Sequence, residues 1–68
     1  MAISYKRLHH LMIEKELSPV MLIRKTGISG NVFTRIRRNE YVSLESLEKI
    51  CKALHCTLDE IVEFYDEE

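Results

Sequence analysis

Serine or threonine recurs just before five segments that carry apolar residues at helical spacing. These five residues are Ser4, Ser18, Ser29, Ser43 and Thr57. A hydroxyl oxygen at the start of a helix accepts a hydrogen bond from one of the unpaired backbone N–H groups of the first turn. The pattern predicts helices at about residues 5–16, 19–26, 30–38, 44–55 and 58–65. Because no segment alternates apolar and polar residues with period two over a useful length, no strand is predicted.

Length and composition agree with one small helical domain. The chain has 68 residues, of which 46% are hydrophobic and 31% are charged, an ordinary balance for a globular protein. We expect a single domain over residues 1–68, with a frayed acidic tail at residues 66–68. No apolar run reaches the ~18–20 residues of a membrane helix, and two cysteines do not indicate a disulfide scaffold. The expectation is a soluble, cytoplasmic, nucleoid-associated protein with no membrane partner.

Charge is divided unevenly along the chain, although the formal net charge is only −1. Residues 1–38 hold eight lysines and arginines against two glutamates, a net charge of +6, and residues 39–68 carry a net charge of −7. Such a division indicates that one half meets a polyanion while the other half stays away from it. Composition alone leaves open the alternative that these charges are spread over a solvated surface.

Residues 18–39 predict two short helices joined by a tight turn. Pro19 suits the first position of a helix, where its missing N–H has no intrahelical partner. Gly27 supplies the left-handed residue that ends the first helix, because such a conformation costs other residues more. Ile28 is expected to fill the corner between the helices, and Ser29 to cap the second one. Two short helices with a glycine-containing turn are typical of the helix-turn-helix of DNA-binding proteins.

The second of these helices, residues 30–38, has one apolar and one polar face on a helical wheel. The apolar face is made of Val32, Phe33 and Ile36. The polar face is made of Gly30, Asn31, Thr34, Arg35 and Arg38, with Arg37 at its edge. In the major groove Asn pairs with adenine and Arg with guanine through two hydrogen bonds. Carboxylates are absent, as the approach to phosphate requires.

A wider set of residues carries a resemblance to a known family. They are Leu17-Ser18, Leu22, Lys25-Thr26-Gly27-Ile28-Ser29, Phe33, Ile36, Val42-Ser43-Leu44, Leu47 and the stretch Ile50 to Ile61. Over about residues 4–64 the chain resembles the Cro/phage-repressor type of helix-turn-helix regulators, the XRE family, in its compact single-domain branch. The resemblance implies an all-α, five-helix, lambda-repressor-like domain. It also implies that the third helix enters the major groove of double-stranded DNA, usually in a homodimer on paired half-sites.

The polar face and the resemblance together give the candidate site. The residues predicted to read bases are Gly30, Asn31, Thr34 and Arg35. The residues predicted to contact phosphates are Ser18, Ser29, Val32, Arg37, Arg38 and Tyr41. Arg7, Arg24 and Lys25 are further basic groups expected near phosphates.

The chain departs from the family pattern in four places. Pro19 cannot donate a backbone N–H to a phosphate, and Ile23 stands where a small residue often packs between the two helices. Met12 and Arg37 stand where many members keep an Arg–Glu pair. Asn39 replaces a frequent glycine, and Asn tolerates the same left-handed geometry.

Homodimer formation is expected because one short helix reads only a few base pairs. The predicted dimer surface is Ile61, Phe64 and Tyr65, which offer more apolar area than one buried face needs. This surface lies in the acidic half of the chain, so it is kept away from phosphate.

The leading functional prediction is a sequence-specific DNA-binding transcriptional regulator, in particular a repressor. One alternative is a protein-interaction module on the same fold, such as an antitoxin-like partner. A second is a small metal-dependent enzyme, suggested by His9, His10, His55, Cys51 and Cys56. The two cysteines are five residues apart, which is not the Cys-x-x-Cys spacing of structural zinc sites. We predict no catalytic residue, metal, cofactor or small-molecule ligand.

Overall fold

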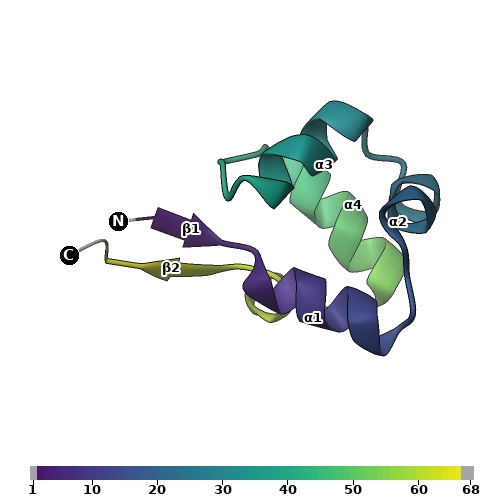
Figure 1. Ribbon diagram of the computed structural model, residues 1–68, viewed down its shortest axis with the longest axis horizontal. Coiled ribbons are helices and arrows are strands. Elements are labelled where there is room, and N and C mark those ends of the chain that lie inside the picture. The colour runs from purple at the N-terminus through teal and green to yellow at the C-terminus, as the bar shows by residue number, and fades with distance from the viewer. Residues whose placement is uncertain (1, 67–68) are drawn as a thin grey trace.

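Four α-helices occupy the middle of the chain, and two short strands pair its ends (Figure 1). This computed structural model describes residues 2–66. The helices are α1 (Lys6–Glu14), α2 (Pro19–Thr26), α3 (Gly30–Arg37) and α4 (Leu44–Leu54). The strands are β1 (Ala2–Ser4) and β2 (Glu63–Tyr65), and a single 3-10 turn, η1 (Leu58–Glu60), precedes β2.

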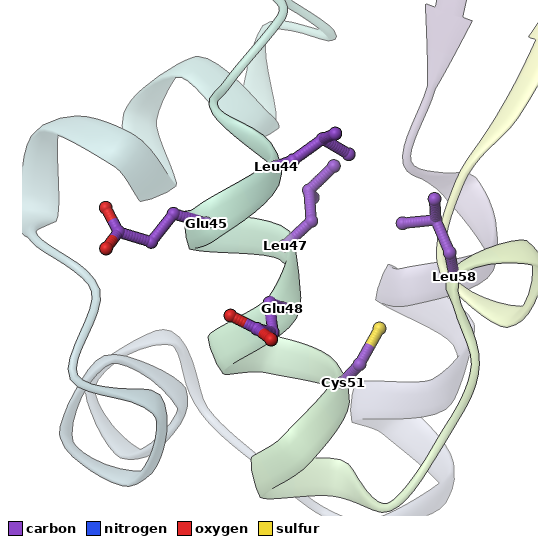
Figure 2. Close-up of a pocket in the computed structure, with 6 residues that line it drawn as sticks. All are labelled: Leu44, Glu45, Leu47, Glu48, Cys51 and Leu58. Atoms are coloured by element: carbon purple, nitrogen blue, oxygen red, sulfur yellow. The ribbon is translucent and has the colours of Figure 1, made fainter.

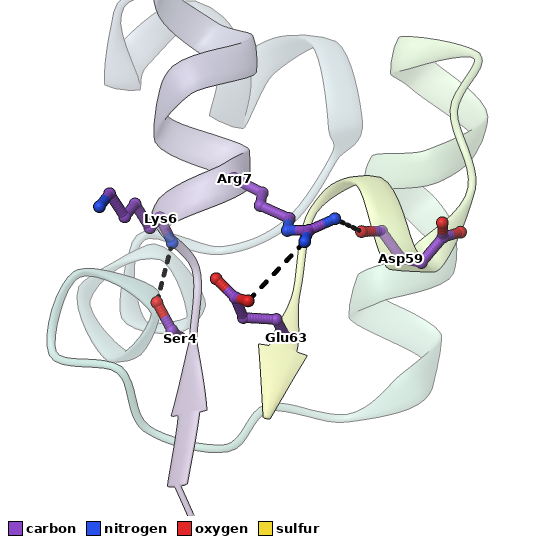
Figure 3. Close-up of polar contacts among 5 residues, drawn as sticks. All are labelled: Ser4, Lys6, Arg7, Asp59 and Glu63. Carbon is purple, nitrogen blue, oxygen red and sulfur yellow. Dashed lines mark hydrogen bonds and ion pairs between the residues drawn. The ribbon is translucent and has the colours of Figure 1, made fainter. Parts of the chain in front are cut away.

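Local hydrogen bonds start three of the four helices as predicted. The hydroxyl oxygens of Ser18, Ser29 and Ser43 each accept a backbone N–H from three residues further on, over 3.1–3.2 Å. The predicted cap at Ser4 is wrong. The N-cap of α1 is Tyr5, and the Ser4 hydroxyl accepts the Lys6 N–H at 3.2 Å (Figure 3).

The predicted fifth helix, residues 58–65, is wrong. Thr57 and Glu60 do form a capping box, in which the Thr57 N–H donates to Glu60 Oε1 at 2.9 Å. The helix then stops after one turn, at the β-branched residues Ile61 and Val62, which favour extended structure and lead into β2. Both side chains enter the core, where they are 0% and 7% exposed. The mostly helical class and the helix-turn-helix are found, but the described chain has four α-helices rather than five.

The two strands were not expected from the sequence. They pair antiparallel, with Ala2 opposite Tyr65, Ile3 opposite Phe64, and Ser4 opposite Glu63. The pairing satisfies backbone groups at both ends of the chain, and it places Ile3 in the core. Of the predicted acidic tail, Asp66 lies outside any strand or helix, whereas Glu67 and Glu68 lie outside the described residues.

A single apolar cluster joins the four helices to β1 and to the two residues before β2. Helix α4 lies against α2, and α2 lies against α3 (Figure 1). The buried members of the cluster are Ile3, Tyr5, Leu8, Met12, Leu22, Ile28, Phe33, Ile36, Leu47, Ile50, Leu54, Ile61 and Val62. This packing holds α3 against the rest of the molecule through one face and leaves its other face in solvent.

Candidate nucleic-acid interface

The turn between α2 and α3 has the conformation that the sequence predicts. Gly27 ends α2 in the left-handed region, with φ of 80°, and its N–H donates to the Ile23 carbonyl at 2.9 Å. Ile28 is buried, at 5% exposure, and fills the corner between the two helices. Thr26 adds a buried link, because its hydroxyl donates to the Leu22 carbonyl at 2.8 Å and accepts the Ile28 N–H at 3.3 Å.

Helix α3 shows the two faces that the helical wheel predicts. Phe33 and Ile36 are buried, at 5% and 0% exposure. The side chains of Asn31 and Arg35 are exposed, as are Gly30 and Thr34. All four residues predicted to read bases therefore lie on the solvent-facing side of α3, where a DNA groove can reach them.

Thr34 presents a restricted set of groups on this face. Its hydroxyl donates to the Gly30 carbonyl one turn earlier, at 3.0 Å. In that arrangement the hydroxyl proton is used within the helix, and the outward groups are an oxygen lone pair and a methyl group. Thr34 is therefore suited to contact a donor or a thymine methyl group rather than a base acceptor.

Five of the six residues predicted to contact phosphates are exposed. Arg37 and Arg38 line a shallow cavity of about 350 Å³ together with Thr34. Ser18 and Ser29 are exposed at the starts of α2 and α3, and Tyr41 is 61% exposed.

Val32 is placed differently from the other predicted phosphate contacts. Its side chain is half-buried against the core, and its N–H already donates to Ser29 Oγ at 3.2 Å. A contact between Val32 and a phosphate would have to replace or share that bond.

Arg7 makes contacts within the molecule that the sequence does not predict. Its guanidinium donates to the Asp59 carbonyl at 3.2 Å and pairs with the Glu63 carboxylate at 3.8 Å (Figure 3). These bonds tie α1 to η1 and β2. Arg7 is thus engaged with the acidic half of the chain, and its role at a phosphate stays a prediction.

His9 is a residue of α1 that the site prediction left out. It is half-buried, and burial lowers the pKa of its imidazole, with a further lowering by the positive charge of Arg37 and by His10. The positive charge of Arg37, at the end of α3, therefore acts on His9 of α1. The adjacent histidines of α1 were visible in the sequence, but their distance from Arg37 depends on where the fold places α1 and α3.

The histidines and cysteines of the chain are the residues considered above for metal or thiol chemistry. Within residues 2–66, no three His, Cys, Asp or Glu side chains come together in a cluster that could hold a metal ion. Cys51 and Cys56 are free, and burial raises the pKa of Cys56 to about 11, so it is a thiol at neutral pH. The Cys56 N–H donates to the Cys51 carbonyl at 3.0 Å and closes the end of α4. Across the same residues, every helix is too short or too polar to cross a membrane.

The fold and the exposed face of α3 define a helix-turn-helix protein of the DNA-binding class. A family model described as the Cro/C1-type HTH DNA-binding domain matches residues 7–67, and the chain belongs to this family. Among solved structures, the chain is similar to the crystal structure of the transcriptional regulator VanUg, form II. The two chains are 33% identical with a TM-score of 0.92, over 97% of this chain and 88% of that one. No match was found among curated proteins.

These comparisons confirm the resemblance on which the site prediction rests. The family match and the structural neighbour support the prediction of a DNA-binding transcriptional regulator. The roles of individual residues on α3 remain predictions.

Proposed function

We propose that the chain is a transcriptional repressor that occupies an operator by placing α3 in the major groove of duplex DNA. The exposed face of α3 carries this proposal. Asn31 and Arg35 project from a short helix whose opposite face is buried, and residues 30–37 include no Asp or Glu. Asn and Arg are the side chains that pair with adenine and guanine in the major groove.

The residues on and beside this face fall into two groups, one assigned to base contacts and one assigned to phosphate contacts. Asn31 and Arg35 lie on the exposed side of α3 and are assigned to bases. Arg37, Arg38 and Tyr41 lie at its end and just beyond, and are assigned to phosphates. Phosphate contacts fix the position of the protein on the duplex, and base contacts select the sequence.

Selection of bound duplexes from a random library tests the proposal directly. With the selected site in hand, Arg35→Ala should cost about 1–3 kcal/mol of binding free energy and relax the preference at one base pair. Arg38→Ala should weaken binding to all duplexes alike. Equal losses on selected and random DNA from both substitutions would make Arg35 a phosphate contact instead.

Repression is tested by the position of the selected site in a reporter. A site that overlaps the promoter should reduce transcription when the protein is present, because the bound protein excludes the polymerase. A site placed upstream should have little effect. Increased transcription from the upstream site would identify an activator.

We also propose that the protein binds DNA as a homodimer, with two candidate surfaces for the contact between the copies. Ile61 is fully buried, so it cannot contribute to a dimer contact, whereas Phe64 and Tyr65 are 58% and 46% exposed. An apolar groove of about 450 Å³ lies between α4 and η1 (Figure 2). Leu44 and Leu58 are exposed at this groove, at 73% and 40%.

The groove is the better candidate because it is concave as well as apolar. Leu47 and Cys51 form part of its lining, and Glu45 and Glu48 also border it, with carboxylates that point away from Leu58 (Figure 2). Contact between two copies would cover Leu44, which is 73% exposed in the single chain. The acidic character keeps this surface away from the DNA phosphates.

Sedimentation of three proteins separates the two candidate surfaces. Leu44→Glu should abolish dimers if the groove is the contact, and a glutamate is well tolerated in the first turn of a helix. The double change Phe64→Ala/Tyr65→Ala should abolish them if β2 is the contact. Strictly 1:1 complexes of the unaltered protein on every selected site would refute the dimer.

A further inference from the structure

Two consecutive backbone bonds close the end of the recognition helix α3. The Asn39 N–H donates to the Ile36 carbonyl at 3.1 Å, and the Glu40 N–H donates to the Arg35 carbonyl at 2.9 Å. Asn39 itself is left-handed, with φ of 57°. This is the pattern of a Schellman motif, in which the first residue past the helix takes a left-handed conformation.

One buried residue near the start of the sequence, Tyr5, holds both Asn39 and Glu40, through its side chain and its backbone. Tyr5 is fully buried, at 0% exposure. Its hydroxyl donates to the Glu40 carbonyl at 2.7 Å, and its backbone N–H donates to Asn39 Oδ1 at 3.1 Å. Burial raises the pKa of the Tyr5 hydroxyl, so this group remains a donor at physiological pH.

The bond to Asn39 explains why asparagine suits this position. Glycine would supply the left-handed backbone conformation at lower cost, but it has no side-chain acceptor for the Tyr5 N–H. Tyr5 is the N-cap of α1, where the backbone N–H has no partner within the helix. The side chain of Asn39 therefore joins the end of α3 to the start of α1.

The turn held in this way carries candidate DNA contacts on both sides. Arg38 immediately precedes Asn39, and Tyr41 immediately follows Glu40. Arg38 and Tyr41 are both exposed. A small rotation of the turn would move both side chains together relative to the face of α3.

We propose that Tyr5 and Asn39 are positioning residues for DNA binding, which set the direction in which Arg38 and Tyr41 leave the recognition helix. The inference rests on the proposed function, because it needs a DNA complex in which this turn contacts phosphates. Neither Tyr5 nor Asn39 needs to touch DNA. They hold the turn in one conformation before DNA binds, so that less conformational entropy is lost on binding.

Tyr5→Phe is the sharpest test, because it removes one hydroxyl and keeps the buried ring. Affinity for a selected duplex should fall roughly three- to tenfold, the range expected from one lost hydrogen bond. Thr57→Ala is the control, because it removes a cap at η1 without touching this turn. If Tyr5 only stabilised the fold, both variants would melt at a lower temperature and bind DNA normally at 20 °C, where each is folded.

A double-mutant cycle shows whether Tyr5 acts through the turn. In an Arg38→Ala/Tyr41→Ala background, Tyr5→Phe should have little further effect on affinity, since the side chains that it positions are absent. Asn39→Gly should resemble Tyr5→Phe in the unaltered background. Full loss from Tyr5→Phe in the altered background, or none in the unaltered one, would overturn the inference.

The test also separates this inference from the proposed function. If the unaltered protein binds no duplex at all, the proposed function fails. If the unaltered protein binds a selected duplex and Tyr5→Phe binds it equally well, only the positioning role fails.

Discussion

The chain has two glycines, both in the helix-turn-helix, and the backbone conformation requires glycine at only one of these positions. Gly27 has φ of 80°, a conformation that side chains with a Cβ rarely adopt. Gly30 is in the first turn of α3 with ordinary helical geometry, and a Cβ added there would meet nothing within 4 Å. The fold therefore needs glycine at the first position but not at the second. If α3 enters the major groove as proposed, a base edge or a phosphate close to position 30 would favour glycine there.

Substitution of each glycine by alanine should separate folding from binding. Gly30→Ala should leave the free energy of unfolding unchanged or raise it by up to about 1 kcal/mol, since alanine is the better helix former. The same change should weaken DNA binding. Gly27→Ala should lower stability by about 1–2 kcal/mol through backbone strain. Thermal melts and binding isotherms check both, and unchanged affinity of Gly30→Ala would show that DNA stays clear of this position.

We predict that His9 makes stability and DNA binding respond to pH in opposite directions. Its pKa is lowered in the folded state, so the fold favours the neutral imidazole. This contribution to stability is fully present above the unfolded value of about 6.5 and is lost as the pH falls through the lowered folded value. A phosphate near Arg37 would favour the charged imidazole, so DNA affinity should rise over the same interval.

Titrations between pH 7.5 and 5.5 should show that the free energy of unfolding falls and DNA affinity rises as the pH is lowered. His9→Gln should reduce both of these pH dependences. His55→Asn is the control, because His55 caps α4 in a left-handed conformation that asparagine tolerates. An unaltered pH dependence of affinity in His9→Gln would place the DNA away from α1.

At the scale of elements, the strand β1 makes a larger contribution than its three residues suggest. Ile3 is 4% exposed and opposite Phe64, so the start of the chain is part of the core. Ile3→Val should lower the free energy of unfolding by about 0.5–1.5 kcal/mol. Ile13→Val is the matched control, since Ile13 is 74% exposed, and it should change stability by less than about 0.5 kcal/mol. Equal melting temperatures for the two variants would mean that β1 does not pack in solution.

Elements held by local interactions were predictable from the sequence, and elements held by distant ones were not. The caps at Ser18 and Ser29 and the left-handed Gly27 depend on atoms within about four residues, so their residue types reveal them. The β1–β2 pairing depends on contacts between the two ends of the chain, and three residues are too few to show an alternating pattern. The β-branched Ile61 and Val62 were a signal against the fifth helix.

In the candidate site, too, features set by local interactions were predictable and features set by packing were not. The exposed face of α3 was predictable because it repeats with the period of one helix. Four other features were not predictable, because they depend on how separate elements pack. They are the burial of Ile61, the pairing of Arg7 with Glu63, the effect of Arg37 on His9 and the Tyr5–Asn39 bond.

For the whole molecule, the division of charge predicts opposite effects of salt on its two associations. DNA binding should weaken as salt rises, with a slope of about −0.9 in log–log form for each phosphate neutralised. Dimer formation through the groove should strengthen, because salt screens the repulsion between the carboxylates of Glu45 and Glu48 on the two copies. Sedimentation and binding isotherms from 50 to 400 mM salt measure both. A dimer that dissociates as salt rises would exclude the acidic groove as its contact.

The pairing of Ala2 with Tyr65 also has a kinetic consequence, because it closes a loop of almost the entire chain. Closing so long a loop costs chain entropy, and contacts within and between neighbouring helices are gained without that cost. The helix-turn-helix should therefore form early during folding, and the sheet should join last. In the native protein the elements that form last should open first. Separation of β1 from β2 should therefore be the local unfolding event with the lowest free-energy cost. Amide exchange should then be faster at the strands than in α4, and Tyr5 is the first residue that such an opening reaches.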